Sequence, residues 1–200
     1  LKLRGQAMQR AVPVGVGAMA ALLGLDYEAV AKIAEEAATG DEICAAANDN
    51  ANGQVVISGH AAAVARACDF AKERGARRAM ELPVSAPFHT PLMQPAAAVM
   101  ADAFQDVTLS DANIPVISNV DAQPHRKAVE IRRLLVRQVS EPVMWTQCVM
   151  TLLQAGCNQF AECGPGKVLT GLVKRIHREA QCFALEDPDV LRSAASEYLL

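Results

Sequence analysis

Among the four histidines of this sequence, His89 is the strongest candidate for chemistry. It lies in the segment 85–91 (SAPFHTP), between a predicted strand and a predicted helix. Loops of this kind carry many of the ligand-binding and catalytic groups of α/β proteins. An imidazole there can act as a general base toward a hydroxyl or thiol. The alternative is that His89 caps the following helix. We expect His60, His125 and His177 to be solvated helix residues.

Arg4 is the second candidate, because it lies beside Gly5 on a predicted helix that has little other charge. A guanidinium can bind a carboxylate through two parallel hydrogen bonds, which a lysine cannot do as rigidly. An ordinary surface arginine is the alternative. The polar run Asn48-Asp49-Asn50 can also contact a ligand, although we predict a turn over residues 48–53 because Asn, Asp and Gly tolerate left-handed backbone angles.

Two further features are weaker. The turn at residues 164–167 (GPGK) precedes a predicted helix and can present backbone N–H groups to an anion. Its spacing does not fit G-x-x-x-x-G-K-[ST], which excludes a P-loop. Cys163, just before that turn, is a candidate nucleophile, but a cysteine that ends an apolar strand is usually inert packing.

The sequence contains a candidate base but no matching nucleophile motif. G-x-S-x-G, the pattern of a strained serine turn, occurs nowhere in the 200 residues. The chain also begins with Leu1, inside a predicted helix. We therefore expect it to be part of a longer polypeptide.

Composition sets the broad class of protein. With 52% hydrophobic and 20% charged residues, the 200-residue chain can form one sizeable domain, or a domain with a small insert, and disorder is excluded. A net charge of −3 argues against a nucleic-acid binder. The apolar stretch 11–25 is broken by proline and glycines, which argues against a membrane span, and no signal peptide is evident. Six cysteines without a C-x-x-C pair argue against a zinc site or a disulfide scaffold and favour the cytoplasm.

The first half of the chain predicts six alternating elements. Their order is β-α-β-β-α-β, which is typical of a ferredoxin-like unit. A helix over residues 1–11 is expected to precede them. The six elements are strand 17–25, helix 27–39, strand 43–47, strand 54–59, helix 60–74 and strand 78–84. Asp26 is the expected N-cap of helix 27–39, and Gly40 is expected to end it.

The second half alternates differently. Strands that alternate with helices predict a parallel sheet with βαβ crossovers. The expected elements are helix 90–105, strand 114–118, helix 126–139, helix 145–154, strand 160–163, a helix from 167 and strand 181–185.

Several motifs in this order resemble those of bacterial malonyl-CoA:acyl carrier protein transacylases. They are RGQAMQ (4–9), VGAMAALLGL (16–25), NDNANGQVVISGH (48–60), LPVSAPFHTPLM (82–93), PVISNVD (115–121), LVRQVSEPVMW (135–145) and ECGPGKVLTGLVKRI (162–176). The resemblance implies an α/β fold, with an incomplete α/β-hydrolase-like large subdomain (1–14 and 85–200) and an inserted ferredoxin-like small subdomain (15–84). The family's N-terminal part, with its Gly-Gln-Gly loop and GHSLGE serine motif, has no counterpart in this sequence.

The resemblance also assigns roles to individual residues. It implies that His89 activates the absent serine and that the backbone carbonyl of Gln138 orients the histidine ring. It implies that Arg4 binds the free carboxylate of a malonyl group, and Phe88 is the residue type that accompanies malonyl rather than branched acyl units. Asn48 and Asn50 match asparagines near the thioester entrance, although Asp49 between them replaces a commonly apolar residue.

The function so implied is transfer of malonyl from malonyl-CoA to the phosphopantetheine thiol of acyl carrier protein, through a seryl intermediate. It requires no metal and no cofactor beyond these substrates, and this chain alone is expected to be inactive. Three alternatives remain open: an acyltransferase domain of a polyketide synthase, a non-catalytic ferredoxin-like interaction module, and a thiol hydrolase using Cys163 and His89.

Overall fold

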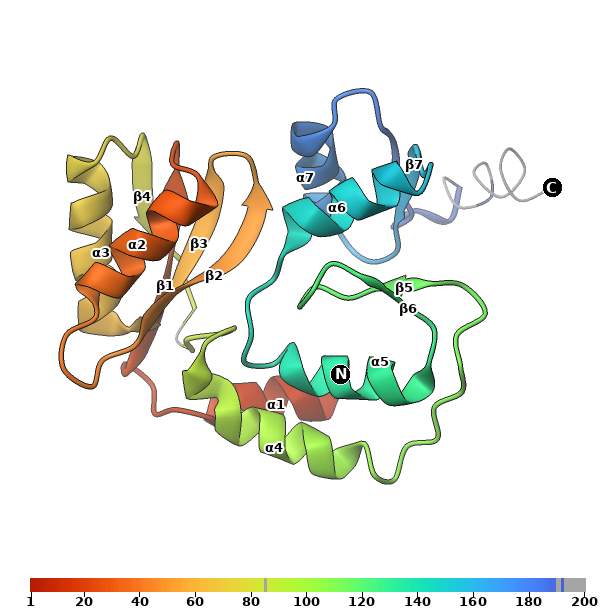
Figure 1. Cartoon of the computed structure of the whole chain (residues 1–200), viewed down its shortest axis with the longest axis horizontal. Helices are drawn as coiled ribbons and strands as arrows, with labels where there is room; N and C mark the ends of the chain where they lie inside the picture. The colour runs from red at the N-terminus through yellow and green to blue at the C-terminus, as the bar shows by residue number, and fades with distance from the viewer. Residues whose placement is uncertain (85, 190–191, 193–200) are drawn as a thin grey trace. The chain divides into compact units, whose positions relative to one another are not determined.

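The computed structural model describes residues 1–84, 86–189 and 192 of an α/β protein. The chain forms two compact units, Leu1–Cys148 and Val149–Leu200. Figure 1 shows the elements of both units along the chain. The boundary falls within helix α6 (Trp145–Gln154), and each unit is described by itself below.

The first unit contains a four-stranded antiparallel sheet in the strand order β2-β3-β1-β4. The β-α-β-β-α-β order predicted from the sequence is confirmed. The elements are β1 (Gly17–Leu23), α2 (Tyr27–Ala37), β2 (Cys44–Ala51), β3 (Gln54–His60), α3 (Ala61–Glu73) and β4 (Arg78–Glu81). Both helices pack on one face of the sheet, around a shared hydrophobic core (Figure 1).

Strand β1 is buried on both faces. Ala18, Ala20 and Leu22 belong to the core beneath α2 and α3, whereas Met19 and Ala21 belong to a second cluster on the opposite face. Because both faces need apolar side chains, this strand is a continuous apolar run rather than an alternating one.

Helix α2 begins as the sequence predicts. The carboxylate of Asp26 accepts a hydrogen bond from the Ala29 N–H at 2.8 Å. The helix ends at Ala37, before the predicted end at Gly40. Arg66 on α3 donates two hydrogen bonds to the Ala37 carbonyl, at 3.0 and 2.7 Å, and so satisfies a carbonyl that the helix leaves free.

The turn predicted for residues 48–53 is wrong in its extent. Strand β2 continues to Ala51, and only Asn52 and Gly53 form the turn. Beyond its pairing with β3, β2 exchanges backbone hydrogen bonds with Val143: the Asp49 N–H donates to its carbonyl, and its own N–H donates to the Ala47 carbonyl. This second pairing outweighs the local preference for a turn.

The rest of the first unit surrounds a separate hydrophobic core. Its members are Met8, Met93, Ala96, Ala97, Met100 and Val139. They come from or follow α1 (Lys2–Arg10), the 3₁₀ helix η1 (Pro91–Met93), α4 (Gln94–Ala103) and α5 (Ala128–Arg137). This core packs α1 against the segment that begins immediately after His89.

A short antiparallel pair joins β5 (Val116–Ile117) and β6 (Pro124–His125). Strand β5 is shorter than the predicted strand 114–118, and β6 is absent from the prediction. Two histidines predicted to lie in solvated helices are therefore placed differently. His125 is on β6, where its Nε2 lies 3.1 Å from the Asp121 carboxylate, and His60 ends β3, where its Nδ1 accepts from the Ile43 N–H at 2.8 Å.

The second unit contains the predicted parallel crossover. Strands β7 (Gln159–Glu162) and β8 (Gln181–Ala184) pair in parallel and are connected through α7 (Val168–Ile176). Within the part of the chain that the structure describes, no helix is both long and apolar enough to cross a membrane.

Candidate active site

The loop that carries His89 is fixed by contacts on both sides. Pro87 lies directly against Gly17 of β1, so that a Cβ at Gly17 would be 2.3 Å from the Pro87 Cδ. Thr90 is completely buried and its hydroxyl donates to the Pro87 carbonyl at 2.8 Å. These two contacts close the turn around Phe88 and His89.

His89 itself has an unusual backbone conformation. Its φ is +60°, in the left-handed region that few residues other than glycine adopt. Such a conformation costs about 1–3 kcal/mol and persists only where the surrounding structure enforces it. The contacts of Pro87 and Thr90 supply that enforcement. Strained residues of this kind are concentrated at functional sites.

The His89 ring is held by two backbone carbonyls. Its Nδ1 lies 3.0 Å from the Gln138 oxygen and 3.1 Å from the Glu141 oxygen. Because a carbonyl only accepts hydrogen bonds, Nδ1 must carry the proton. In the neutral ring Nε2 is then unprotonated and can accept a proton from a substrate or nucleophile.

The Gln138 carbonyl is available because α5 ends there. Gln138 follows the last helical residue and keeps a helical backbone. The residue four positions later, which would donate to it in a longer helix, is Pro142 and has no N–H. The carboxyl end of a helix also carries partial negative charge, which favours a nearby cation by about 0.3–1 kcal/mol. The end of α5 can therefore stabilise a protonated His89.

The pKa of His89 is nevertheless lowered. Burial is the largest cause, and the Arg4 charge acts in the same direction, while the carbonyls of Gln138 and Glu141 oppose both. The imidazole is therefore neutral at neutral pH, which is the form that a general base requires.

Arg4 lies on α1 and acts electrostatically on His89. Its Nε is buried, and among the residues that the structure describes it has no hydrogen-bond partner. Burial lowers the pKa of the guanidinium, which still stays charged. A partly buried cation without a partner is well suited to bind an anionic group.

Phe88 joins two hydrophobic clusters. It packs against the core of α1 and α4 and also against the cluster on the outer face of the sheet, which includes Met19 and Val56.

Asn48 is paired with Val56 in the register of β2 and β3. The register shifts between Ala46 and Asn48, so this pairing lies at a β-bulge next to the residues of that cluster.

Asn50 lies two residues further along β2 and is half-buried. Among the described residues, neither Asn48 nor Asn50 forms a hydrogen bond with His89. Asp49 between them is buried and accepts a hydrogen bond from the Thr146 hydroxyl at 2.9 Å. Burial raises its pKa. Asp49 thus ties β2 to α6 and has a structural role.

The turn at 164–167 does not form an anion site. Its Gly166 N–H donates to the Glu186 carboxylate at 2.8 Å. At the start of α7, the N–H groups of Leu169 and Thr170 donate to Glu162 at 3.0 and 2.8 Å. The protein's own carboxylates therefore occupy the donors that the sequence suggested for a ligand. Cys163 is exposed in this second unit rather than packed.

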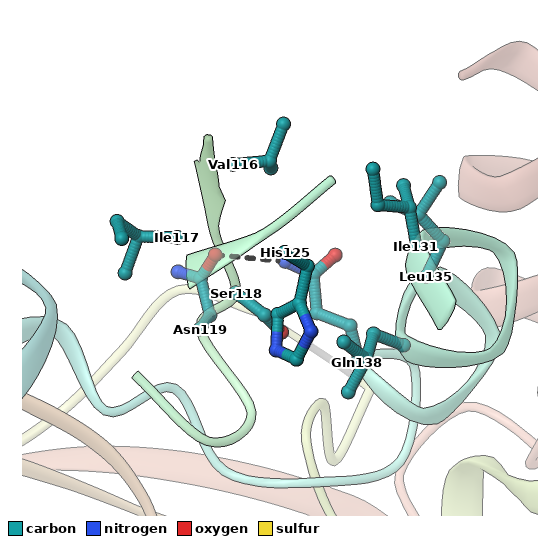
Figure 2. A pocket seen from close by; sticks show the side chains of 9 residues that line it. Val116, Ile117, Ser118, Asn119, His125, Ile131, Leu135 and Gln138 are labelled. Atoms are coloured by element: carbon teal, nitrogen blue, oxygen red, sulfur yellow. Dashed lines mark hydrogen bonds between the residues drawn. The ribbon is translucent and has the colours of Figure 1, made fainter. Parts of the chain in front are cut away.

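Sequence reasoning missed several residues around Gln138. Glu141 supplies the second carbonyl, and its side chain forms a two-point ion pair with Arg137. The Gln138 amide donates to the Asn119 side chain at 3.1 Å, as the dashed line in Figure 2 shows. The only signal in the sequence is Pro142, which predicts that α5 must stop and leave carbonyls free.

Figure 2 shows a pocket that adjoins this region. Its volume is about 70 Å³, and its lining combines apolar side chains with His125, Asn119 and Gln138. Neither His89 nor Arg4 lines it. Among the described residues, no group of three or more His, Cys, Asp or Glu side chains is placed to hold a metal ion.

A histidine fixed in one tautomer, close enough to feel the charge of an unpartnered arginine, is an arrangement suited to nucleophilic catalysis on a substrate that bears an acid group. Among the described residues, no hydroxyl or thiol forms a hydrogen bond with Nε2 of His89. Comparison with known proteins agrees with this class. Residues 1–189 match the acyl transferase domain family, and the chain belongs to that family.

The chain is similar to proteins named malonyl CoA-acyl carrier protein transacylase. The chain is 45% identical over 197 residues to the malonyl CoA-acyl carrier protein transacylase of Salmonella typhimurium, covering 98% of this chain and 63% of the relative. The solved transacylase of Coxiella burnetii is 42% identical with a TM-score of 0.94, covering 98% and 61%. A malonyl-transacylase solved in complex with a type II polyketide acyl-carrier protein is 43% identical with a TM-score of 0.93, covering 98% and 62%. The chain thus spans about three-fifths of the length of these proteins.

Proposed function

We propose that this chain is the histidine- and arginine-bearing part of a malonyl-CoA:acyl carrier protein transacylase. The observation that carries the proposal is the pairing of His89, whose Nδ1 lies against two carbonyls, with the unpartnered guanidinium of Arg4. The nucleophilic serine comes from the portion of the relatives that this chain does not span. The partners are malonyl-CoA and acyl carrier protein, and the reaction uses no metal and no further cofactor.

In the first half-reaction, Nε2 of His89 takes the proton from the serine hydroxyl as the oxygen attacks the malonyl thioester carbon. The carbon–sulfur bond breaks, coenzyme A leaves as a thiolate that receives the proton, and a malonyl-serine ester remains. In the second half-reaction, Nε2 removes the proton from the phosphopantetheine thiol, which attacks the ester. The serine oxygen leaves and is protonated, so the base returns to its initial state.

The carbonyls of Gln138 and Glu141 replace the carboxylate that orients a histidine in a serine–histidine–aspartate triad. They fix the tautomer as a carboxylate does, but they stabilise the imidazolium less because they carry only partial charge. A thioester tolerates this weaker support because a thiolate is a far better leaving group than an amine.

Arg4 supplies the preference for malonyl over acetyl. The malonyl carboxylate satisfies the buried guanidinium, whereas an acetyl group leaves it unpaired at a cost of several kcal/mol. Phe88 forms an apolar wall of the acyl site. Asn48 and Asn50 contact the pantetheine arm. Asn48 is supported by its pairing with Val56, which belongs to the same cluster as Phe88.

The finer fold is also part of the proposal. The sheet order β2-β3-β1-β4 with two helices on one face supports a ferredoxin-like subdomain over residues 15–84. Residues 1–14 and 85–200 then belong to an α/β-hydrolase-like subdomain that the unspanned portion completes. The six cysteines are all free, which supports a reducing compartment, the cytoplasm.

The direct test is the reading frame that encodes this chain. We expect a G-H-S-x-G motif upstream of the codon for Leu1, and we expect the whole encoded protein to gain one malonyl group on that serine with malonyl-CoA. Intact-mass analysis measures this adduct. A start codon immediately before Leu1, or no adduct, would refute the proposal and favour a non-catalytic interaction module.

The role of Arg4 has its own test in the whole protein. Arg4→Ala should lower malonyl loading relative to acetyl loading on the order of 10²-fold or more. Arg10→Ala, which removes a basic side chain in the last turn of the same helix, is the matched control and should leave the ratio unchanged. An unchanged ratio in Arg4→Ala would assign the selectivity elsewhere.

A second candidate is malonyl supply to a polyketide carrier protein, which the similarity to the carrier-bound transacylase favours. Loading rates with a fatty-acid carrier and a polyketide carrier, measured side by side, separate the two. A higher rate with the polyketide carrier would select this candidate.

A further inference from the structure

We propose that the Arg137–Glu141 ion pair is a positioning device, which shapes the turn after α5 so that two carbonyls converge on Nδ1 of His89. The base that this device serves is the one assigned in the proposed function, so its catalytic meaning rests on that proposal. The positioning itself is a property of this chain.

The ion pair spans the same residues as the turn. Arg137 Nε and Nη2 each lie 2.7 Å from one oxygen of the Glu141 carboxylate, a two-point geometry that fixes both side chains. On the backbone, the N–H groups of Ser140 and Glu141 both donate to the Arg137 carbonyl, at 3.1 and 3.0 Å. Side chains and main chain therefore close one loop from residue 137 to 141.

That loop determines where the carbonyls point. Pro142 disfavours a helical backbone at Glu141 and cannot donate to Gln138. The chain must therefore leave the helix between Gln138 and Glu141. The ion pair selects a path in which the oxygens of residues 138 and 141 lie 3.0 and 3.1 Å from the same nitrogen.

Stability alone gives little reason for this pair. Its side chains are 37% and 35% exposed, and ion pairs with such exposure contribute about 0–1 kcal/mol to folding. What distinguishes this pair is its position across the turn that faces His89. Arg133 and Glu130 form a comparable pair on the same helix, three residues apart and also solvent-accessible, but away from the turn.

Two other side-chain contacts hold the same turn. The Gln138 amide donates to Asn119 at 3.1 Å (Figure 2), and the Gln94 amide on α4 donates to the Ser140 hydroxyl at 3.1 Å. These contacts hold the turn against α4 and against the loop that follows β5, while the ion pair sets the internal shape of the turn.

The experiment reads the ring protons of His89 directly. In the full chain labelled with ¹⁵N-histidine, the Nδ1 and Nε2 chemical shifts report which nitrogen holds the proton. We expect the wild-type chain to carry it on Nδ1. Glu141→Gln should raise the population of the other tautomer on the order of threefold to tenfold, the change that accompanies loss of one ordinary hydrogen bond.

Two controls separate positioning from a general effect on the helix. Glu130→Gln removes a carboxylate from the neighbouring pair and should leave the His89 shifts at wild-type values. The charge-swapped variant Arg137→Glu/Glu141→Arg restores an ion pair and should restore the wild-type tautomer. If Glu141→Gln fails to fold, as judged by thermal unfolding, Arg137→Lys keeps the charge without the two-point geometry and tests the same point.

Unchanged His89 shifts in Glu141→Gln, or in its substitute Arg137→Lys, would overturn the inference. Equal changes in Glu141→Gln and Glu130→Gln would overturn it as well. Because the tautomer is measured without substrate, the two proposals can fail separately. A wild-type whole protein that transfers no malonyl would refute the proposed function, whereas a shifted tautomer in Glu141→Gln would still support the positioning role.

Discussion

The contact between Gly17 and Pro87 connects the sheet to the catalytic loop, and it makes Gly17→Ala an informative substitution. An added Cβ would meet three atoms of the Pro87 ring, at 2.3, 2.6 and 2.9 Å. Since carbon atoms pack at about 3.5–4.0 Å, the ring must move by more than about 1 Å. We expect a loss of about 1–3 kcal/mol in the free energy of unfolding, as is typical of overpacking.

The same displacement should reach His89, two residues beyond Pro87. A misplacement of about 1 Å can lower a catalytic rate on the order of 10²-fold. Denaturant unfolding of the chain measures the first effect, and kcat of the whole protein measures the second. Gly171→Ala is the control, because nothing lies within 4 Å of its added Cβ and alanine is favoured in a helix. A Gly17→Ala chain with wild-type stability and unchanged His89 ring signals would refute the reasoning.

Three further outcomes follow from the contacts described above. Thr90→Val removes the buried hydroxyl that donates to the Pro87 carbonyl. It should lower the free energy of unfolding, measured with denaturant, by about 1–3 kcal/mol. A variant as stable as the wild type would contradict this. Since folding lowers the pKa of His89, the unfolded chain binds the proton first. Stability should therefore fall as the pH drops through about 6.5, the pKa of an unperturbed histidine. His89→Gln should flatten that part of the stability–pH curve, and an unchanged curve would contradict the assignment. Iodoacetamide at neutral pH should modify the exposed Cys163. It should not modify Cys44 until the chain unfolds, because burial raises the pKa of that thiol to about 12. Mass spectrometry of the digested protein shows which thiol has reacted.

The sequence predicted the order of elements well, because each has a strong local signal. Asp26 marks the start of α2, and the apolar run of β1 marks a strand with two buried faces. It failed where the decisive contact is distant in sequence. The polar residues 48–50 favour a turn locally, but pairing with Val143 extends β2 through them. The β6 strand is only two residues long and has no periodicity to detect.

The site was predicted in its parts but not in its geometry. The resemblance assigned a ring-holding role to Gln138, and the structure places its carbonyl 3.0 Å from His89 Nδ1. The second carbonyl, from Glu141, depends on the path of a turn that no spacing rule describes. The turn at 164–167 shows the reverse error: its Gly166 N–H was expected to face a ligand, but it donates to the carboxylate of Glu186, twenty residues away.

The left-handed backbone at His89 affects how its chemistry can be studied. Alanine at this position would remove the imidazole and also occupy a conformation that alanine tolerates poorly, so a lost activity would mix two causes. Asparagine accepts this region of the Ramachandran plot more readily and has no titratable ring. A His89→Asn protein is therefore the better inactive reference for trapping bound substrates, since the loop around it can keep its native path.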